Sequence, residues 1–356
     1  MFPNEVEARG MLADTVEYVL GVDTHRDVHA LAVVAAATGT VELETTVAAS
    51  GHGYREALRL AGRQAAGRRV WAIEGTGSWG AGLCRFLEAE GERVLEVDRP
   101  RREGRSTGKS DPLDAVRAAR TALAEARLPQ PRSAGKREEL RALVAAREGA
   151  LSAKRAGLCQ LHALIVTAPE PLRNELRGLS RARLLVRLRG LRPDRNKSHP
   201  HGLLIALRSV ANRVNELTRE ERELGNEIRT LVRELAPTLL EEPGIGPASA
   251  AQILLAWSHP GRLHSEAAFA RLAGTAPIPA SSGKTIRYRL DRGGDRQLNR
   301  ALHTIINSRR KNHPATIAYT QRRTAEGKTV RETIRCLKRY LARHLYRMLE
   351  ASPTAA

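Results

Sequence analysis

Val16–Val47, VEYVLGVDTHRDVHALAVVAAATGTVELETTV, decides the fold of the first third of this chain. It contains two apolar runs, Val16–Asp23 and His29–Ala37, which are separated by a short polar turn. Thr38-Gly39-Thr40 marks a second tight turn, and Val41–Val47 follows as a third strand candidate. Strands joined by such short turns run antiparallel, because parallel strands need a long crossover. The stretch therefore predicts an antiparallel meander of three strands.

Alternating helices and strands follow this meander. The pattern predicts, in chain order, a helix at Gly53–Ala65, a strand at Arg69–Glu74, a helix at Ser78–Glu90, a strand at Val94–Val97 and a helix opening at Asp111-Pro112. Three antiparallel strands followed by alternating helix and strand is the order expected of an α/β ribonuclease H-like domain. We place this domain at residues 1–132.

The middle of the chain, which we place at residues 133–238, reads as α-helical. Lys136–Val166 and Leu172–Arg189 are each predicted to form one helix. Apolar residues then repeat with heptad spacing through Leu203–Leu235, and the repeat is broken where Glu221 falls on the seam. Such a stripe predicts a coiled coil, and a coiled coil between chains implies an oligomer. The alternative is a long helix that packs on other helices of its own chain.

The charge balance points to a polyanionic partner. The chain has 356 residues, with 59 Lys plus Arg against 39 Asp plus Glu, a net charge of +20. Nucleic acid is the first candidate, since such a charge attracts phosphate backbones. A membrane is excluded as partner, because the longest apolar run, near Ala30–Ala37, is too short to span a bilayer. Met1–Gly10 has no apolar signal core, so we expect a cytoplasmic protein.

Cysteine and histidine give no sign of a metal site. Three scattered cysteines follow no zinc-type spacing: Cys84, Cys159 and Cys336. Four histidines lack a ligand pattern with a third partner: His25, His29, His259 and His264. We therefore assign none of these residues to a metal.

Four carboxylates lie at the ends of predicted elements. Asp23 and Glu74 each end an apolar strand, and Asp111 and Asp114 share the first turn of a helix. Each has an ordinary alternative reading, as a strand-end acid or as a helix cap. Adjacent strands and a facing helix of a ribonuclease H-like sheet would bring all four to one edge. Two-metal phosphoryl transfer needs such hard oxygen ligands, so we predict a catalytic site for Mg²⁺, with Mn²⁺ as the alternative ion.

Residues 239–356 are predicted to form a compact, basic, mainly α-helical domain. Pro243–Pro247, PGIGP, resembles the turn of a helix-hairpin-helix, whose glycines let backbone N–H groups approach phosphate. Gly244 and Gly246 are therefore predicted to contact DNA. The alternative is a plain helix-breaking turn.

A serine followed by a basic run marks the same domain. Ser282 precedes Gly283-Lys284, where a loop serine would be exposed and electrostatically activated. A serine nucleophile would store the broken DNA bond as a phosphoserine link. Ser281 is the alternative nucleophile, and a solvated loop is the alternative reading of the segment. The following cationic residues are predicted to contact phosphate, with a solvated surface as the alternative: Lys284, Arg287, Arg289, Arg292, Arg296 and Arg300.

These motifs resemble the DEDD-type insertion-sequence transposases of the insertion-sequence 110 family. The resemblance covers about residues 17–345 and rests on motifs in family order: Gly21–His25, Ile73–Gly77, Lys109–Ala115, Pro243–Pro247, Leu272–Pro277, Ser282–Lys284 and Arg292–Leu298. The chain departs from the family pattern at Thr275 and Ala276, where Leu and then Ala or Ser are expected. It departs again at Gly294, where an Asn is expected.

The resemblance implies a RuvC-type domain, a coiled-coil linker and a serine-bearing transposase domain. It makes the four acids a metal-binding tetrad and Ser282 the nucleophile. It also implies a bacterial homodimer or homotetramer in which acid and serine sites of different protomers complete one another. The implied partners are double-stranded donor and target DNA and a structured noncoding bridge RNA. A protein bound to that DNA would be associated with the bacterial nucleoid.

Three other functions are weighed against this one. A RuvC-like structure-specific endonuclease or junction resolvase would keep the tetrad but need no serine nucleophile. An actin-like sugar kinase should show a second glycine-rich phosphate loop, which the sequence lacks. A basic, coiled-coil architectural DNA-binding protein would tolerate Asp23→Asn or Glu74→Gln without loss of function.

Overall fold

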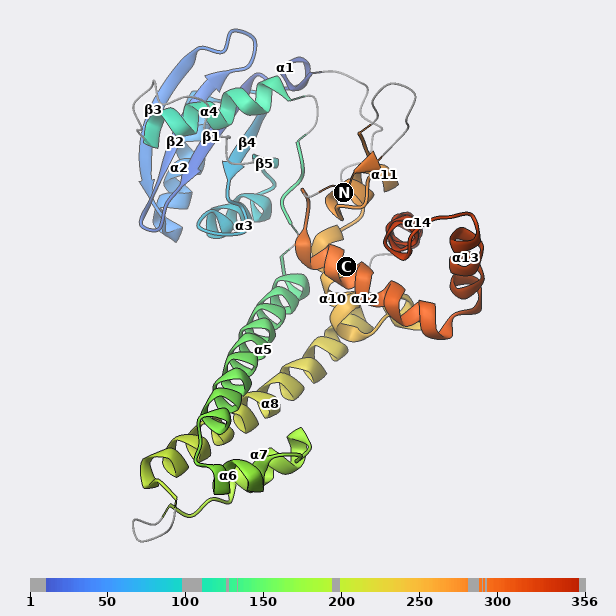
Figure 1. Ribbon diagram of the computed structural model, residues 1–356. Helices are drawn as coiled ribbons and strands as arrows, with labels where there is room; N and C mark the ends of the chain where they lie inside the picture. The colour runs from blue at the N-terminus through green and yellow to red at the C-terminus, as the bar shows by residue number, and fades with distance from the viewer. Residues whose placement is uncertain are drawn as a thin grey trace. The chain divides into compact units, whose positions relative to one another are not determined.

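The computed structural model describes residues 11–97, 111–125, 128–132, 134–193, 199–280, 288, 289, 291 and 293–351, with the backbone alone at 111 and 112. The chain divides into two compact units (Figure 1). The first comprises residues 1–134 with 261–263, and the second comprises 135–260 with 264–356. The predicted division of the second part at residues 238 and 239 stays a prediction.

The first unit is a mixed α/β domain. Its elements are α1 (Leu12–Thr15), β1 (Tyr18–Thr24), β2 (Val28–Ala35), β3 (Val41–Ala48), α2 (Gly51–Gln64), β4 (Arg69–Glu74), α3 (Ala81–Ala89), β5 (Val94–Val97) and α4 (Asp111–Ala124). The described strands form one sheet of five in the order β3-β2-β1-β4-β5. β1, β2 and β3 are antiparallel neighbours, whereas β4 is parallel to both β1 and β5. The predicted meander and its α/β continuation are confirmed.

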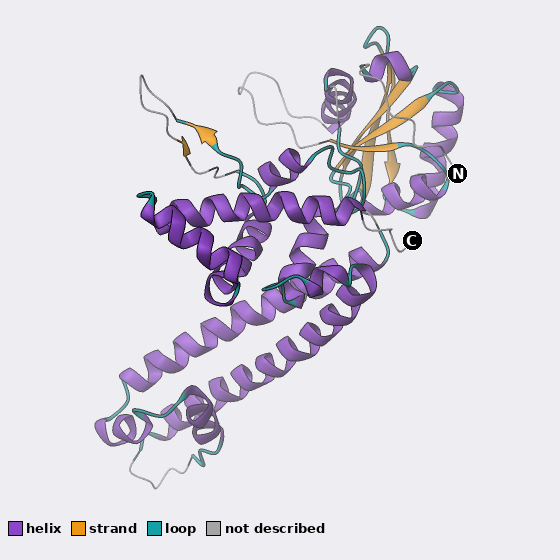
Figure 2. Cartoon of the chain, turned by 90° about the vertical axis from the view of Figure 1, so that its right-hand side faces the viewer, coloured by secondary structure: helices purple, strands orange, loops and turns teal. Residues whose placement is uncertain are grey.

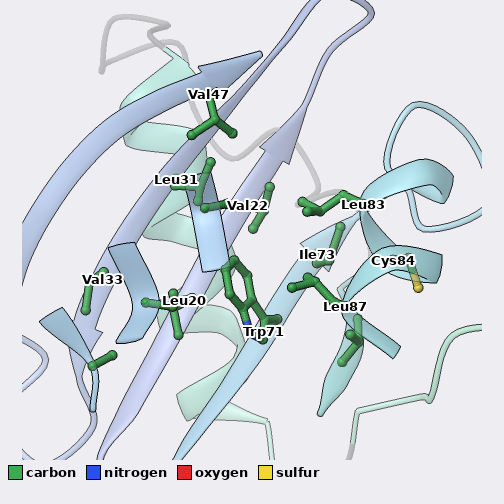
Figure 3. Close-up of a cluster of buried hydrophobic side chains, with 14 residues drawn as sticks. Leu20, Val22, Leu31, Val33, Val47, Trp71, Ile73, Leu83, Cys84 and Leu87 are labelled. Atoms are coloured by element: carbon green, nitrogen blue, oxygen red, sulfur yellow. The ribbon is translucent and has the colours of Figure 1, made fainter. Parts of the chain in front are cut away.

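Helices cover both faces of this sheet, so its strands are almost continuously apolar. Side chains alternate between faces along each strand. Leu20 and Trp71 belong to the cluster that includes α2 and α3, whereas Val19 and Val70 pack with α4. Figure 3 shows Trp71 at the centre of the first cluster. Cys84 of α3 lies in the same cluster, and burial, together with nearby carboxylates, raises the pKa of its thiol to about 12.

The second unit is mainly helical. Its elements are α5 (Lys136–Val166), α6 (Glu170–Leu176), α7 (Arg181–Arg189), α8 (His201–Leu235), α9 (Thr238–Glu241), α10 (Pro247–Trp257), α11 (Glu266–Leu272), β6 (Ile278–Pro279), β7 (Tyr288–Arg289), α12 (Arg296–Asn312), α13 (Pro314–Ala325) and α14 (Val330–Ala351). β6 and β7 form a short antiparallel ladder. Within the described ranges, no helix is long and apolar enough to span a membrane.

The heptad stripe of α8 packs on α5 of the same chain. The two helices run antiparallel as a hairpin (Figure 2), and Val214 of α8 packs against Gly157 of α5. Leu207, Val210 and Ile228, which belong to the predicted seam, are buried. The structure thus gives this seam a partner helix within the chain, and the predicted coiled coil between chains is not confirmed.

Glu221, which interrupts the heptad stripe of α8, forms ion pairs with α5. Glu221 accepts a hydrogen bond of 3.0 Å from Arg147 Nη2 and pairs with Lys154 Nζ, both on α5. All three side chains are about one-fifth exposed. Glu221 therefore joins α5 to α8 by charge where the apolar repeat stops.

The single helix predicted at Leu172–Arg189 is wrong. The segment forms two helices, α6 and α7, because the chain turns at Gly178, whose φ is +84°. Positive φ is readily adopted by glycine and ends a helix. Ser180 then caps α7, with its Oγ accepting a hydrogen bond from the Arg183 backbone N–H. The predicted helix at Ser78–Glu90 likewise begins later, at Ala81.

Candidate active site

Asp23 and Glu74 stand side by side at the ends of neighbouring parallel strands. The paired register of β1 and β4 reaches Val22 opposite Ile73, and the two acids follow directly. Adjacent strands lie about 4.8 Å apart. By strand alternation, Asp23 shares a face with Val19, and Glu74 shares it with Ala72; both apolar residues pack with α4. The two carboxylates therefore belong to the sheet face that α4 covers.

The backbone of α4 rests on β1 at Gly21. A Cβ on Gly21 would lie 2.0 Å from the Ala115 carbonyl oxygen and 2.8 Å from the Ala119 nitrogen. Ala119 and Ala122 pack in one cluster with Val19, so α4 runs from the Asp23 end of β1 toward its start. The first turn of α4 consequently lies at the end of the sheet where β1 terminates.

The remaining two acids are on that first turn. Asp114 directly precedes Ala115, and the helix begins at Asp111. The side chain of Asp111 lies outside the described part of the structure. The first turn of α4 thus lies at the same end of the sheet as Asp23 and Glu74.

A turn after β4 fixes the position of Glu74. Thr24 Oγ1 donates a hydrogen bond of 2.9 Å to the Glu74 carbonyl oxygen. Gly75 has φ +71°, and a Cβ on Gly80 would lie 3.0 Å from Thr24 Cγ2. The tight turn through Gly75 and Gly80 therefore holds the ends of β1 and β4 together.

Two basic side chains that we did not predict as site residues contact the acids. His25 Nε2 lies 3.1 Å from Asp23 Oδ2, and Arg117 Nη1 donates a hydrogen bond of 2.6 Å to Asp114 Oδ1. Asp23 is buried, and the Asp114 side chain is 22% exposed. The i, i+3 spacing of Asp114 and Arg117 on one helix is the sequence signal that could have revealed this pair.

Carboxylate oxygens are the ligands that hard divalent cations prefer, so the donor chemistry at this edge fits such an ion. Among the side chains that the structure describes, however, no group of three His, Cys, Asp or Glu residues is arranged to hold a metal. The side chain of Asp111 is outside that set, and Asp114 Oδ1 is oriented toward Arg117 on its own helix.

The Pro243–Pro247 turn is anchored to α12. Gly244 has φ +77°, and a Cβ there would lie 3.3 Å from the Ile305 carbonyl oxygen. Arg309 Nε donates a hydrogen bond of 2.6 Å to the Pro243 carbonyl oxygen. Gly246, at the N-terminus of α10, has open space where its Cβ would be. The helix-hairpin-helix detail is not confirmed, and DNA contact by either glycine stays a prediction.

The Leu272–Pro277 motif and the Arg292–Leu298 motif, which are separate in the sequence, contact each other at Leu272 and Gly294. Gly294 has φ +86°, and a Cβ there would lie 2.4 Å from the Leu272 carbonyl oxygen, which accepts a hydrogen bond of 2.7 Å from the Asp295 N–H. Asp295 then caps α12, its Oδ1 accepting from the Gln297 and Leu298 N–H groups. Asn and Gly both tolerate positive φ, which explains why Gly294 can stand where an Asn is expected.

The predicted basic run is only partly described. Arg289 on β7 and Arg296 at the start of α12 are exposed. Arg300 donates a hydrogen bond of 2.6 Å to Glu148 of α5. The other predicted residues lie outside the described ranges, and so does the serine pair: Lys284, Arg287, Arg292, Ser281 and Ser282.

Comparison with known proteins identifies the family. A family model described as "Transposase IS116/IS110/IS902 family" matches residues 236–321, and a DEDD model of the IS110 type, described as "Transposase", matches residues 20–168. The "Insertion element IS110 uncharacterized 43.6 kDa protein" of Streptomyces coelicolor is 32% identical over 148 residues. That match spans 41% of this chain and 36% of the relative's length. With both parts matched in chain order over more than half of its length, the chain belongs to the IS110 family of transposases.

Proposed function

We propose that this protein is the transposase of an insertion sequence, which cuts and rejoins double-stranded DNA. The observation that carries the proposal is the convergence of Asp23, Glu74 and the first turn of α4 at one edge of the sheet. The family membership and the net charge of +20 support a DNA substrate.

In this proposal the first unit is a ribonuclease H-like nuclease domain of the RuvC type. Asp23, Glu74, Asp111 and Asp114 would hold divalent metal, Mg²⁺ or Mn²⁺. When bound, the metal neutralises charge on the attacking and leaving oxygens. The burial of Asp23 at the strand end and the close contact of α4 with Gly21 support this assignment.

The serine supplies the joining half of the reaction. Ser282 Oγ attacks the phosphorus, its proton passes to a base, and the phosphodiester P–O bond breaks with release of a DNA hydroxyl. The broken strand is then held as a phosphoserine ester. Attack by the hydroxyl of another strand on that ester forms the new phosphodiester and frees the serine. Each step exchanges one phosphate ester for another, so no external energy source is needed.

The family resemblance extends the proposal to partners. A structured bridge RNA from the element pairs with donor and target DNA, and the basic surface of the protein holds the RNA backbone. The protein acts as a homodimer or homotetramer, so that the acids of one protomer and the serine of another complete a site. The solvent-exposed basic residues of the second unit, such as Arg289 and Arg296, are candidates for phosphate contacts.

A two-plasmid recombination assay tests the reaction. We expect Asp23→Asn and Glu74→Gln to abolish recombination while DNA binding is retained. Ser282→Ala and Ser281→Ala form a matched pair of adjacent substitutions, of which only the first should block both recombination and the covalent protein–DNA adduct trapped with detergent. Full recombination by Ser282→Ala would exclude the nucleophile, and retained strand cleavage alone would favour a junction resolvase.

The guide RNA is tested with the same plasmids. Recombination is measured with the flanking noncoding DNA of the element present, deleted, or supplied as RNA from a separate transcript. We expect deletion to abolish recombination and the separate transcript to restore it. Recombination that is independent of the flanking DNA would contradict the guide RNA and leave the tetrad untouched.

A further inference from the structure

A cavity of about 550 Å³ lies in the second unit, between the turn at Gly274–Pro277, strand β7 and helix α14. Its wall is rich in positive charge. Five cationic side chains line it: Arg289, Lys328, Arg335, Lys338 and Arg339. Only two lining residues are acidic, Asp291 and Glu332.

Both acids accept hydrogen bonds from nearby residues. Asp291 Oδ1 accepts a hydrogen bond of 2.8 Å from the Gly293 N–H. Glu332 Oε2 accepts from the Thr329 N–H at 2.9 Å and from its hydroxyl at 2.7 Å, at the start of α14. Within the described part of the chain, none of the five cations forms an ion pair with a carboxylate. The Thr329 hydrogen bonds and, to a smaller extent, the charges of Arg335 and Lys328 lower the pKa of Glu332. With five cationic and two acidic side chains among its described lining residues, the cavity keeps an excess of positive charge.

Lys338 is the most informative of these residues. It is only 6% exposed, and its Nζ donates a hydrogen bond of 2.5 Å to Asn299 Oδ1. Asn299 is oriented by its own Nδ2, which donates to the Ala273 carbonyl oxygen at 2.6 Å. Burial lowers the pKa of Lys338. A buried ammonium whose described partner is a neutral amide is costly, and an anion in the cavity would offset that cost.

The place of the cavity in the fold suggests which anion this is. β6 and β7 pair with each other, and the chain between them carries Ser281 and Ser282. β7 contributes Arg289 to the cavity wall, so an anion there lies against the strand that follows the proposed nucleophile in the sequence. Tyr288, the neighbouring lining residue, is 58% exposed and offers an aromatic face for a base or sugar of the same strand.

We propose that this cavity binds a backbone phosphate of the DNA strand on which the protein acts, with Lys338, Arg335 and Arg339 of α14 as the principal contacts. The proposal rests on the proposed function, because it takes the occupant to be the substrate strand. It assigns α14 a role in positioning DNA, which none of the sequence motifs indicated.

DNA binding by the full-length protein tests the proposal. Affinity for a fluorescently labelled DNA duplex is measured by anisotropy over a series of salt concentrations, in EDTA so that no strand is cut. We expect Arg335→Gln and Lys338→Met each to weaken binding roughly three- to tenfold and to lower the salt slope by about one. Arg331→Gln is the matched control, since Arg331 is exposed on the same helix but does not line the cavity.

The outcomes separate the cavity from the reaction. Wild-type affinity and salt slope for Arg335→Gln, or an equal loss for Arg331→Gln, would overturn the proposal. A loss seen only with RNA of the same sequence would also overturn it, by making the guide the occupant. Arg335 is half-buried and keeps the test valid if Lys338→Met fails to fold. Ser282→Ala should bind DNA normally, so failure of the serine reaction would leave the cavity result standing.

Discussion

Ala115 of α4 lies on Gly21 of β1 so closely that a Cβ on Gly21 would come within 2.0 Å of the Ala115 carbonyl oxygen. Asp114 directly precedes Ala115, and Asp23 follows Gly21 by two residues on the same face of the strand. Backbone packing between a helix and a strand therefore sets the separation of two proposed metal ligands.

Gly21→Ala should destabilise the protein and abolish recombination. The new methyl group would meet helix backbone, which cannot move aside without shifting α4, so we expect a loss of about 3 kcal/mol. Urea denaturation monitored by circular dichroism measures it. Gly62→Ala is the control, because Gly62 lies in α2 with nothing within 4 Å of its Cβ position, and should be neutral or stabilising by about 0.5 kcal/mol. Equal stability of the two variants would contradict the close contact.

Arg117→Ala should strengthen binding of Mn²⁺. Arg117 must release Asp114 before that carboxylate can turn toward a metal, and an i, i+3 ion pair of this kind is worth about 0.5 kcal/mol, or roughly twofold in affinity. Isothermal titration with Mn²⁺ is the measurement. Arg120→Ala, an exposed substitution later on the same helix, should leave the affinity unchanged. The same affinity in both variants would show that the pair does not compete with the metal.

Glu221→Leu should destabilise the α5–α8 hairpin, although it completes the heptad stripe. The substitution would leave Arg147 and Lys154 facing each other without their shared carboxylate, at a cost of about 3 kcal/mol. Replacing all three residues by leucine should recover most of that loss. Thermal denaturation compares the variants, with the exposed Glu220→Leu as a control that changes stability by less than about 0.5 kcal/mol. A more stable Glu221→Leu would show that the seam is purely apolar.

Glu242 should make the second unit sensitive to acid. Burial alone would raise the pKa of Glu242, but hydrogen bonds and charge from His344 and Arg309 together lower it below its ordinary value of 4.5. For a carboxylate with a lowered pKa, the stabilisation is complete above the unfolded value and is lost as pH falls through the folded one.

Denaturation of the wild type and Glu242→Gln from about pH 7 to about pH 3 measures that effect. We expect the wild type to be more stable near neutral pH and the difference to shrink below about pH 4.5. Glu241→Gln, one residue earlier in α9, serves as the control. A stability difference that is constant with pH would contradict the ion pair with Arg309.

Local patterns in the sequence were sufficient for most elements of the first unit. The bounds of β4 and β5 agree with their apolar runs, because buried strands read as continuous hydrophobic segments. α5 agrees as well. The heptad stripe predicted the length of α8 but not its partner, since an apolar seam is the same whether the other helix belongs to the same chain or to another. The break between α6 and α7 was missed because one glycine within an apolar pattern is compatible with a continuous helix.

The sequence by itself determined the family, the succession of strands and helices in the first unit, and the four acids as candidates. Each acid taken alone was better explained as a strand-end acid or a helix cap. Only the tertiary structure decided that Asp23 and Glu74 share the face covered by α4, because that depends on strand register and on Gly21 admitting a helix backbone. It also showed the cationic cavity around Lys338, which brings together residues from separate segments through packing that no periodicity encodes.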